Sequence, residues 1–417
     1  MALNWVWVGF FTVAFATAVV RWVLGEHGIL QALMTAMFDG ARSGFEISLG
    51  LAGVMALWLG LMRVGERAGM IELLARLAGP LLRRLFPAVP QGHPAQGAMT
   101  MNISANLLGL DNAATPLGLK AMRELQTLNT GAPGTASNAQ IMFVVMNTAG
   151  LTLIPTSVIA IRQSIALKQG LGADFNAADI FLPTLLVTFM SLLAGVLAVA
   201  VCQRLPLWRA RFLLPVGAVA GLLAMAVTAL ARLPAEQAAR VAGTTGAGVI
   251  LSVVMLFVLA GAFKRINVYD AFIDGAKEGF GVAIQIVPYL IAILIAIGVF
   301  RAAGCMDFLL SGIGAGVAAM GWDTDFLPAL PVGLMKVLSG AGARGLMIDV
   351  MQTHGVDSFA GRLAAIVQGS TETTFYVLAV YFGSVGIQHA RHALACALFA
   401  DAVGLAAAIG VGYAMLR

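Results

Sequence analysis

The feature that most constrains this chain is a duplicated segment within a largely apolar sequence. Residues 39–45 (Asp-Gly-Ala-Arg-Ser-Gly-Phe) match residues 274–280 (Asp-Gly-Ala-Lys-Glu-Gly-Phe). The same spacing continues without a gap to 68–69 and 303–304, both Ala-Gly, which a chance motif would not do. The chain therefore contains two homologous halves. In a polytopic membrane protein, such halves indicate a transporter-like architecture with the ligand site where the repeats meet.

The composition identifies the bilayer as the solvent. Hydrophobic residues make up 60% of the chain and charged residues 11%, whereas soluble domains average about 45–50% and 25%. At about 20 apolar residues per span, the chain can supply roughly 8–10 membrane-inserted helices. The net charge of +5 is spread over helix ends, which fits positive-inside loops and not a nucleic-acid-binding patch. We predict a multi-pass protein of the cell inner membrane, in contact with lipid and without a nucleic-acid partner.

No motif for catalysis or metal binding is present in the sequence. The three cysteines, Cys202, Cys305 and Cys396, lie far apart in apolar runs, without the spacing of a zinc site or a disulfide framework. The histidines form no ligand set, and there is no nucleophile elbow or Walker motif. We therefore expect no enzyme, no catalytic residues, no bound metal and no cofactor beyond a coupling Na⁺ or H⁺.

Hydropathy divides the chain into five parts. Residues 1–27 form an N-terminal transmembrane helix, and residues 391–417 form a C-terminal one. The first repeat covers residues 28–170 and the second covers residues 266–390. Residues 171–265 form a connector of three spans with no partner in the second half. The duplicated motif itself is interpreted as structural, because its glycines permit close packing and its charges suit the membrane interface.

Each repeat contains an interrupted region, at 91–136 and 304–356, followed by a span expected at 138–161 or 362–386. Sequence rich in Gly and polar residues favours broken or re-entrant helices, which are tolerated at membrane depth only where they face protein or a wet cavity. The fold prediction is thus an all-α, polytopic integral membrane protein. Three crossings between the repeats make them inverted if each repeat crosses an even number of times, and parallel if the number is odd; we expect inversion.

Polar residues fall at corresponding places in the two halves, where lipid would exclude them. Asn102 and Asn106 share one face of a helix, and their amides can both donate and accept hydrogen bonds. Helix breaks near Asp111 and Ser339 would free backbone groups for polar or ionic ligands. Alternatively, the amides only join neighbouring helices. The candidate substrate-binding residues are Asn102, Asn106, Asn112, Asn147, Thr148, Lys336, Ser339, Ser370, Thr371 and Thr374.

Two carboxylates are candidates for ion coupling, Glu372 first and Asp111 second. An intramembrane carboxylate costs about 2.5–3.5 kcal/mol or more to place, which favours a functional role for Glu372. The alternative is an ion pair with Lys336 or Arg344. Asp111 could instead cap a helix. Lys336 could equally be a counter-ion, a group that binds an anionic substrate, or a snorkelling side chain at a helix end.

These polar segments also carry a family resemblance that covers nearly all of the chain. Residues 1–205, with Asn102, Asn106 and the run 111–122, resemble the spore maturation A proteins; residues 255–417, with the runs 331–340 and 369–383, resemble the spore maturation B proteins. The chain is similar to a fusion of the two. Both groups carry the nucleoside-recognition (Gate) domain, which also occurs in concentrative nucleoside transporters and bacterial ferrous-iron transporters.

This resemblance implies an inner-membrane protein with two Gate repeats, but Gate domains serve different cargoes. Position 336 is Lys where the resemblance leads us to expect Arg, and Lys lacks the bidentate geometry that grips carboxylate or phosphate. We expect a secondary transporter of a small polar solute, a nucleoside or related metabolite or an amino acid, driven by protons or sodium. The alternatives are a non-transporting scaffold for envelope or spore maturation and a divalent-metal permease. A homo-oligomer is compatible with each.

Overall fold

The computed structural model describes residues 2–417 except 109–110, 151, 154, 173–174, 206–209, 231 and 233–234. For residues 2–3, 111–113 and several positions between 210 and 242, it describes only the backbone.

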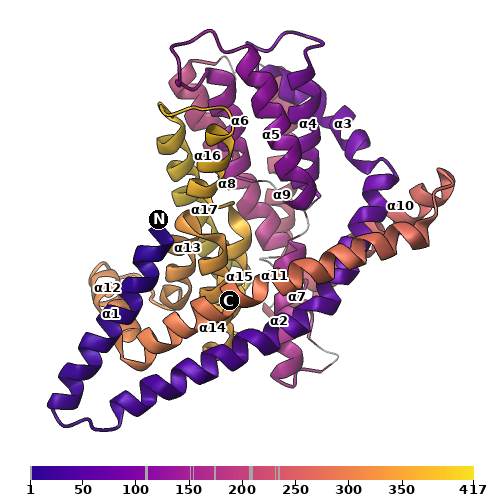
Figure 1. Ribbon diagram of the computed structural model, residues 1–417. Coiled ribbons are helices and arrows are strands. Elements are labelled where there is room, and N and C mark those ends of the chain that lie inside the picture. The colour runs from indigo at the N-terminus through magenta and orange to yellow at the C-terminus, as the bar shows by residue number, and fades with distance from the viewer. Residues whose placement is uncertain are drawn as a thin grey trace. The chain divides into compact units, whose positions relative to one another are not determined.

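The described chain is helical, apart from a single isolated bridge between Thr135 and His389. In chain order (Figure 1), the helices are α1 (Ala2–Val23), α2 (Ile29–Arg67), α3 (Met70–Leu85), α4 (Pro94–Leu107), α5 (Asp111–Thr127), α6 (Asn138–Thr148), α7 (Thr156–Lys168), α8 (Phe181–Gln203), α9 (Ala210–Leu230), α10 (Ala235–Phe263), α11 (Val268–Ala302), α12 (Cys305–Ala319), η1 (Leu327–Ala329), α13 (Leu330–Leu338), α14 (Gly340–His354), α15 (Phe359–Ser370), α16 (Thr374–Gly383) and α17 (Ala393–Met415).

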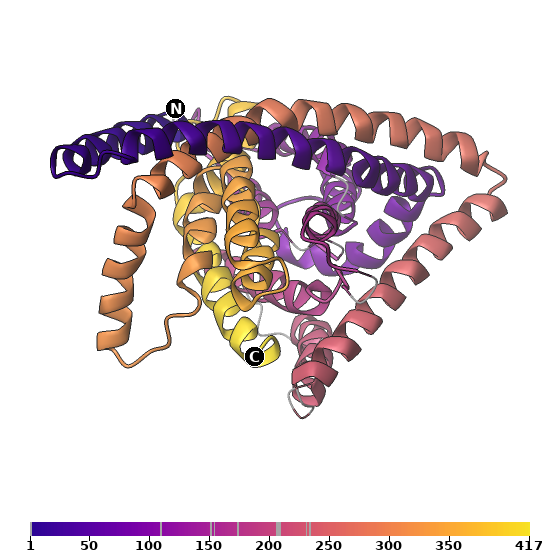
Figure 2. The same cartoon turned by 90° about the horizontal axis from the view of Figure 1, so that it is seen from below.

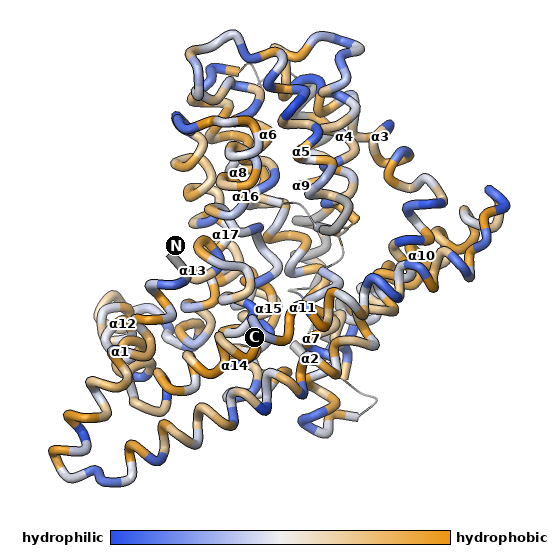
Figure 3. Tube along the Cα trace, in the orientation of Figure 1, coloured by the Kyte–Doolittle hydropathy of each residue, from blue (hydrophilic) through white to orange (hydrophobic). Residues whose placement is uncertain are grey.

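Within the described residues, six helices are long and apolar enough to cross a membrane: α1, α2, α8, α10, α11 and α17. Figure 2 shows α10 as one long unbroken helix that leads into the turn before α11. Hydrophilic residues gather at that turn in Figure 3. These lengths and compositions confirm a multi-pass membrane protein.

The spans expected at 138–161 and 362–386 are not continuous helices, so that part of the prediction is wrong. The first is divided into α6, which ends at Thr148, and α7, which begins at Thr156; the second is divided into α15, which ends at Ser370, and α16, which begins at Thr374. Pro155 has no amide hydrogen for a helical ladder, and the polar run before Thr374 competes for backbone hydrogen bonds. Interrupted helices are thus present in both repeats, whereas re-entry into the membrane stays a prediction.

The duplicated halves adopt the same local structure where their sequences match. After α2 the chain turns at Gly69, with φ of 80°, into α3; after α11 it turns at Gly304, with φ of 78°, into α12. These two glycines occupy matching positions of the repeat, and glycine adopts this left-handed conformation without the steric cost that a Cβ brings. The repeat is therefore structural as well as sequential.

The chain divides into two compact units. Unit 1 contains Met1–Leu57, Ser157–Phe175 and Ala276–Gln368; unit 2 contains Trp58–Thr156, Asn176–Gly275 and Gly369–Arg417. Each unit therefore combines segments of both repeats.

Unit 1 is held together by close helix packing and partly buried polar contacts. Arg301 of α11 forms an ion pair with Asp349 of α14. Lys168 of α7 pairs with Glu46 of α2 at 3.1 Å. Gln169 donates from Nε2 to the carbonyl of Met351 at 2.8 Å, and its Oε1 accepts from the amide of Val356 at 3.0 Å. These contacts fasten α7 to α2 and α14.

The glycines of the duplicated motif mark a close approach of α2 and α11. In unit 1, a Cβ on Gly40 would lie 3.0 Å from the Leu294 carbonyl oxygen, and one on Gly44 would lie 2.9 Å from the Ile291 Cα. In unit 2, a Cβ on Gly275 would lie 2.3 Å from the Leu59 carbonyl oxygen. Rising residue numbers in α2 meet falling numbers in α11, so the two helices pack antiparallel.

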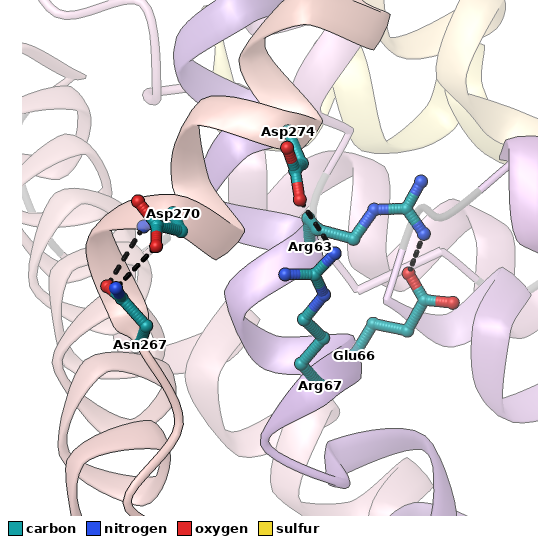
Figure 4. Close-up of polar contacts among 6 residues, drawn as sticks. All are labelled: Arg63, Glu66, Arg67, Asn267, Asp270 and Asp274. Carbon is teal, nitrogen blue, oxygen red and sulfur yellow. Dashed lines mark hydrogen bonds and ion pairs between the residues drawn. The ribbon is translucent and has the colours of Figure 1, made fainter.

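In unit 2, an ion pair lies beside this approach (Figure 4). Arg67 Nη2 lies 2.8 Å from Asp274 Oδ2, and Arg63 pairs with Glu66 at 2.7 Å within α2. Asn267 and Asp270 hydrogen-bond to each other at the start of α11. Asp274 belongs to the duplicated motif, and its contact with Arg67 supports the structural interpretation of that motif.

Helices α8 and α17 pack along each other in unit 2, also antiparallel. A Cβ on Gly195 would contact Ala400, and one on Gly404 would contact Ser191, whose hydroxyl donates to the Ala400 carbonyl at 3.0 Å. Small residues let membrane helices approach closely, so that van der Waals packing and interhelical hydrogen bonds can form. Helices α6 and α16 pack against this pair, and α5 packs in turn against α6 and α16 in the upper part of Figure 1.

Candidate polar cavity in unit 2

A cavity of about 280 Å³ lies among the short helices of unit 2. Its lining comes from both repeats: α4, α5 and α6 from the first, and the α15–α16 break with α16 from the second. The lining residues are Asn106, Ala114, Thr115, Asn147, Glu372, Tyr376, Val377, Val380 and Tyr381.

Two asparagine amides form one wall of this cavity. Asn106 Nδ2 donates to Asn147 Oδ1 at 2.8 Å, and Asn147 Nδ2 donates to the carbonyl of Phe143 at 2.9 Å. The first bond joins α4 to α6, and the second fixes the orientation of the Asn147 amide on its own helix. Two of the predicted binding residues thus lie in direct contact. Their bond is also the interhelical contact that the alternative interpretation expects.

Tyr381 of α16 connects this amide pair to Asn102. Its hydroxyl donates to Asn147 Oδ1 at 3.4 Å and accepts from Asn102 Nδ2 at 3.3 Å. Its ring stacks on Phe143 with centroids 5.8 Å apart. A Cβ on Gly118 would lie 2.2 Å from the Tyr381 hydroxyl, so the glycine makes room for it. The tyrosine is thus positioned by contacts on three sides.

Asn102 itself is fully buried on α4. Its Nδ2 also donates to the Ala114 carbonyl at 2.8 Å, which ties α4 to the first turn of α5. Its Oδ1 accepts no hydrogen bond within the described residues. A buried acceptor of this kind is costly unless a water or ligand satisfies it.

Glu372 lies in the non-helical segment 371–373 between α15 and α16. Its backbone N–H donates to the Thr148 carbonyl at 2.8 Å, which joins the second break to the end of α6. Within unit 2 as described, no lysine or arginine forms an ion pair with its carboxylate. A Cβ on Gly150 would lie 3.1 Å from Glu372 Cγ, so Gly150 leaves room for the side chain. The carboxylate is thereby available to the cavity.

The remaining candidates have different surroundings. Thr148 donates to the Val145 carbonyl at 2.9 Å, and Thr374 donates to Asp401 Oδ2 at 2.6 Å. Ser339, in unit 1, accepts from the Gly342 amide at 3.0 Å and caps α14. The others are buried Ser370 and Thr371 in unit 2, buried Lys336 in unit 1, and Asp111 and Asn112, whose side chains lie outside the described residues.

Three residues that line the cavity were not among the predicted ones: Thr115, Tyr376 and Tyr381. Asp401, which accepts a hydrogen bond from Thr374, was not predicted either. Tyr376 and Tyr381 lie in the run 369–383 that carried the resemblance, but an aromatic residue in an apolar run reads as packing. Asp401 had a clear signal, since a carboxylate within an apolar span is a functional candidate by default. It is 7% exposed and lies in the middle of α17.

Comparison with known proteins decides the family. The family model called Gate, described as nucleoside recognition, matches residues 48–164 and 283–388, which together are more than half of the chain. The chain belongs to the nucleoside-recognition family. The two matched segments fall one in each repeat, so the resemblance inferred from the polar motifs is confirmed.

Two curated relatives correspond to the two parts of this nucleoside-recognition protein. Spore maturation protein A of Bacillus subtilis (strain 168) is 39% identical over 189 residues, 45% of this chain and 89% of the relative. Spore maturation protein B of the same strain is 41% identical over 161 residues, 39% of this chain and 87% of the relative. One half of the chain thus resembles spore maturation protein A, and the other half resembles spore maturation protein B. No solved structure matches the chain.

Proposed function

We propose that this chain is an inner-membrane secondary transporter that binds a nucleoside, or a similarly small polar solute, in the cavity of unit 2. The observation that carries the proposal is the cavity itself: amide, carboxylate and phenol groups from both repeats face one space within a membrane protein. Substrate sites of transporters with duplicated halves lie near such broken helices. The family description, nucleoside recognition, supports the choice of cargo.

The lining of the cavity suits a nucleoside. Its volume, about 280 Å³, lies just below the roughly 300–1,000 Å³ that ligand pockets span. Asparagine amides offer both donors and acceptors to the edge of a base, and the Glu372 carboxylate can accept from ribose hydroxyls. The rings of Tyr376 and Tyr381 offer apolar faces to a base. An amino acid or another small metabolite is the alternative cargo.

Helix packing supports an inverted relation between the repeats. Gly40 meets residues 294–295, and the matching Gly275 meets residues 59–60; these are the same pair of positions with the two halves exchanged. Such an exchange is the signature of a two-fold relation between antiparallel helices. Because repeat-related spans that cross antiparallel face opposite sides of the membrane, we infer inverted repeats.

The correspondence between the two halves also suggests a connector shorter than the predicted 171–265. α10 leads into α11 as α1 leads into α2. Arg21, at the end of α1, donates to the Ala303 carbonyl at 2.9 Å; Lys264, after α10, places its Nζ 2.1 Å from where a Cβ on Gly69 would lie. Each cation thus reaches the matching Ala-Gly turn. We therefore assign α10 to the second repeat.

The experiment that tests the proposal is a thermal-shift screen of the purified chain in detergent, with nucleosides, nucleobases, amino acids, carboxylates and divalent metals, at varied pH and sodium. A ligand at 100 times its Kd stabilises the native state by about 2.7 kcal/mol. We expect stabilisation by nucleosides in the wild type and its loss in Glu372→Gln. A folded sample that responds to none of these solutes would contradict the proposal.

The scaffold alternative has one observation in its favour. Asn102, Asn106, Asn147 and Tyr381 hydrogen-bond mainly to one another, as a purely structural polar network would. It predicts that substitutions there lower stability without changing any ligand response. The screen distinguishes the two functions. If the chain is a scaffold, Asn106→Ala melts at a lower temperature than the wild type, and no solute shifts the melting temperature of either protein.

A further inference from the structure

Two cysteines that lie 194 positions apart in the sequence meet in unit 2. The Sγ atoms of Cys202 and Cys396 are 3.9 Å apart. Cys202 lies in the last turn of α8 and is exposed, whereas Cys396 lies in the first turn of α17 and is 3% exposed. A disulfide bond joins sulfur atoms at about 2.05 Å. The two sulfur atoms would therefore have to approach by about 2 Å.

The register of α8 and α17 keeps these two residues opposite each other. At one end of the helix pair, Gln203 Nε2 lies 3.2 Å from the Nε2 of His392. Further along, the Ser191 hydroxyl donates to the Ala400 carbonyl at 3.0 Å. The cysteine pair lies between these contacts, and one antiparallel register accounts for all three. A disulfide would thus join side chains that helix packing already turns toward each other.

Polar groups that suit the membrane surface surround this end of the helix pair. Gln203 Nε2 donates to the Asn138 carbonyl at 2.9 Å, and Arg391 Nη1 donates to Asn138 Oδ1 at 3.0 Å. Arg204, which follows α8, is exposed. Charged side chains are costly in the bilayer core and favour its interface with water. A water-soluble oxidant can therefore reach Cys202, whereas protein covers Cys396.

We propose that Cys202 and Cys396 form a reversible oxidation site, which a peroxide converts to a disulfide. The Cys202 thiolate attacks the O–O bond and becomes a sulfenic acid, and the other peroxide oxygen leaves as water after it takes up a proton. The Cys396 sulfur then attacks the Cys202 sulfur, so that the S–S bond forms and the hydroxyl leaves as a second water. Two thiols lose two electrons and two protons, and one hydrogen peroxide becomes two waters. A dithiol restores both thiols by thiol–disulfide exchange.

The third cysteine, Cys305, provides an internal comparison. It is 6% exposed in unit 1, and its thiol donates to Thr17 Oγ1 at 3.4 Å. The sequence places no other cysteine in unit 1. A redox-sensitive cysteine is accessible and often lies next to a second thiol that resolves the sulfenic acid. Cys202 meets both conditions, and we expect Cys305 to stay a thiol.

The disulfide would tie α8 to α17 beside the helix that carries one wall of the polar cavity. α6, which carries Asn147, packs on both α8 and α17. Fixing these two helices at one end would restrict the motion of α6 between them. Oxidation should therefore slow cargo uptake. This consequence rests on the proposed function, whereas the disulfide itself does not.

The test is a thiol count on the full chain in detergent, carrying Cys305→Ala, after treatment with hydrogen peroxide, denaturation and labelling with maleimide-PEG. We expect two labels before treatment, none after it, and two again after dithiothreitol, with the unreduced chain migrating as a monomer. The melting temperature should rise by roughly 3–8 °C on oxidation. Dithiothreitol should reverse this rise, whereas it does not reduce methionine sulfoxide. In the matched control, Cys202→Ser, Cys396 should keep its label at the same peroxide dose.

Three outcomes would overturn the proposal. Labels that dithiothreitol does not restore indicate separate, irreversible oxidation of the thiols. A disulfide-linked dimer in place of the monomer indicates that Cys202 pairs between chains. Equal loss of the Cys396 label in Cys202→Ser indicates that Cys202 is not the residue that reacts first. Nucleoside uptake by proteoliposomes separates the two proposals: a disulfide that forms in a chain without uptake, oxidised or reduced, leaves the oxidation site standing and removes the cargo proposal.

Discussion

The two repeats use the same helix breaks for different chemistry. In unit 2, the amide of Asn147 at the end of α6 accepts from Asn106 of the α4–α5 hairpin at 2.8 Å, beside a polar cavity. In unit 1, Gln368 near the end of α15 reaches the α13–α14 hairpin with a longer bond, 3.5 Å to the Gly340 carbonyl. There Ser339, the single residue between α13 and α14, caps α14 by accepting from the Gly342 amide.

This difference separates the features that the two halves share from those that they do not. The shared elements are the glycine turns, the antiparallel packing and the position of each break. The side chains at the breaks are not shared: the first hairpin presents amides to a cavity, and the second satisfies its own backbone. Under the proposed function, recognition belongs to unit 2, and we expect substitutions in the two units to have different consequences.

The largest expected effect separates the cavity carboxylate from a unit 1 residue that lies beside the same α15–α16 break. Glu372→Gln should weaken cargo binding by about 100-fold, near 3 kcal/mol, because it removes a charged acceptor that a bound hydroxyl would need. Gln368→Ala, its matched control in unit 1, should change cargo affinity less than about threefold. Thermal-shift titration of both variants with the best cargo measures this. Equal losses would place recognition in both units and break the comparison.

The next effect tests the antiparallel approach of α2 and α11. Gly275→Ala should lower the free energy of unfolding by about 1–3 kcal/mol, since its Cβ would meet backbone at 2.3 Å. Gly40→Ala is the substitution at the matching position, where the Cβ would lie 3.0 Å from the nearest backbone atom; it should lower the free energy of unfolding by less. Gly53→Ala on α2 is the control, because its Cβ would meet nothing within 4 Å, and it should stabilise by about 0.5–1 kcal/mol. Melting curves give the order.

A smaller effect tests how much of the amide network is structural. Tyr381→Phe removes the hydroxyl that joins Asn102 to Asn147 and should cost about 0.5–1.5 kcal/mol of stability. Tyr376→Phe, on an exposed residue of the same helix, should leave stability unchanged. If both variants melt like the wild type, the network contributes nothing to stability.

The smallest effect concerns pH at the start of α17, outside the span. Burial, and then the charge of Arg391, lowers the pKa of His392 from its ordinary value of 6.5. The unfolded chain then binds a proton at His392 that the folded chain does not. Stability from this group is present above about pH 6.5 and is lost as the pH falls below it. Comparing wild type and His392→Gln at about pH 7.5 and pH 5.5 should show the greater acid loss in the wild type.

The sequence predicted the parts of this fold that repeat and the parts that lipid constrains. Duplication was visible because matching glycines serve matching turns, as at Gly69 and Gly304, and the long spans were visible from hydropathy. The separation of α6 from α7 and of α15 from α16 was not predicted within these spans, because an apolar run of the right length is also typical of one continuous helix. Packing registers such as α8 against α17 depend on small residues that carry no distinct sequence signal.

For the candidate site, the residue types that lipid excludes were the informative ones. Asn106, Asn147 and Glu372 were predicted and line one cavity. Tyr381 was missed, because only its contacts with Asn102 and Asn147 distinguish it from a packing residue. Whether Lys336 and Ser339 of unit 1 contribute to binding stays a prediction.

The most direct test of the central claim is uptake of radiolabelled nucleoside by proteoliposomes under an inward sodium or proton gradient. We predict accumulation above protein-free liposomes for the wild type, and background uptake for a folded Glu372→Gln. Uptake by Glu372→Gln equal to that of the wild type would remove the cavity from the mechanism. Background uptake by a folded wild type across nucleosides and amino acids, under either gradient, would contradict the transport account and favour a scaffold.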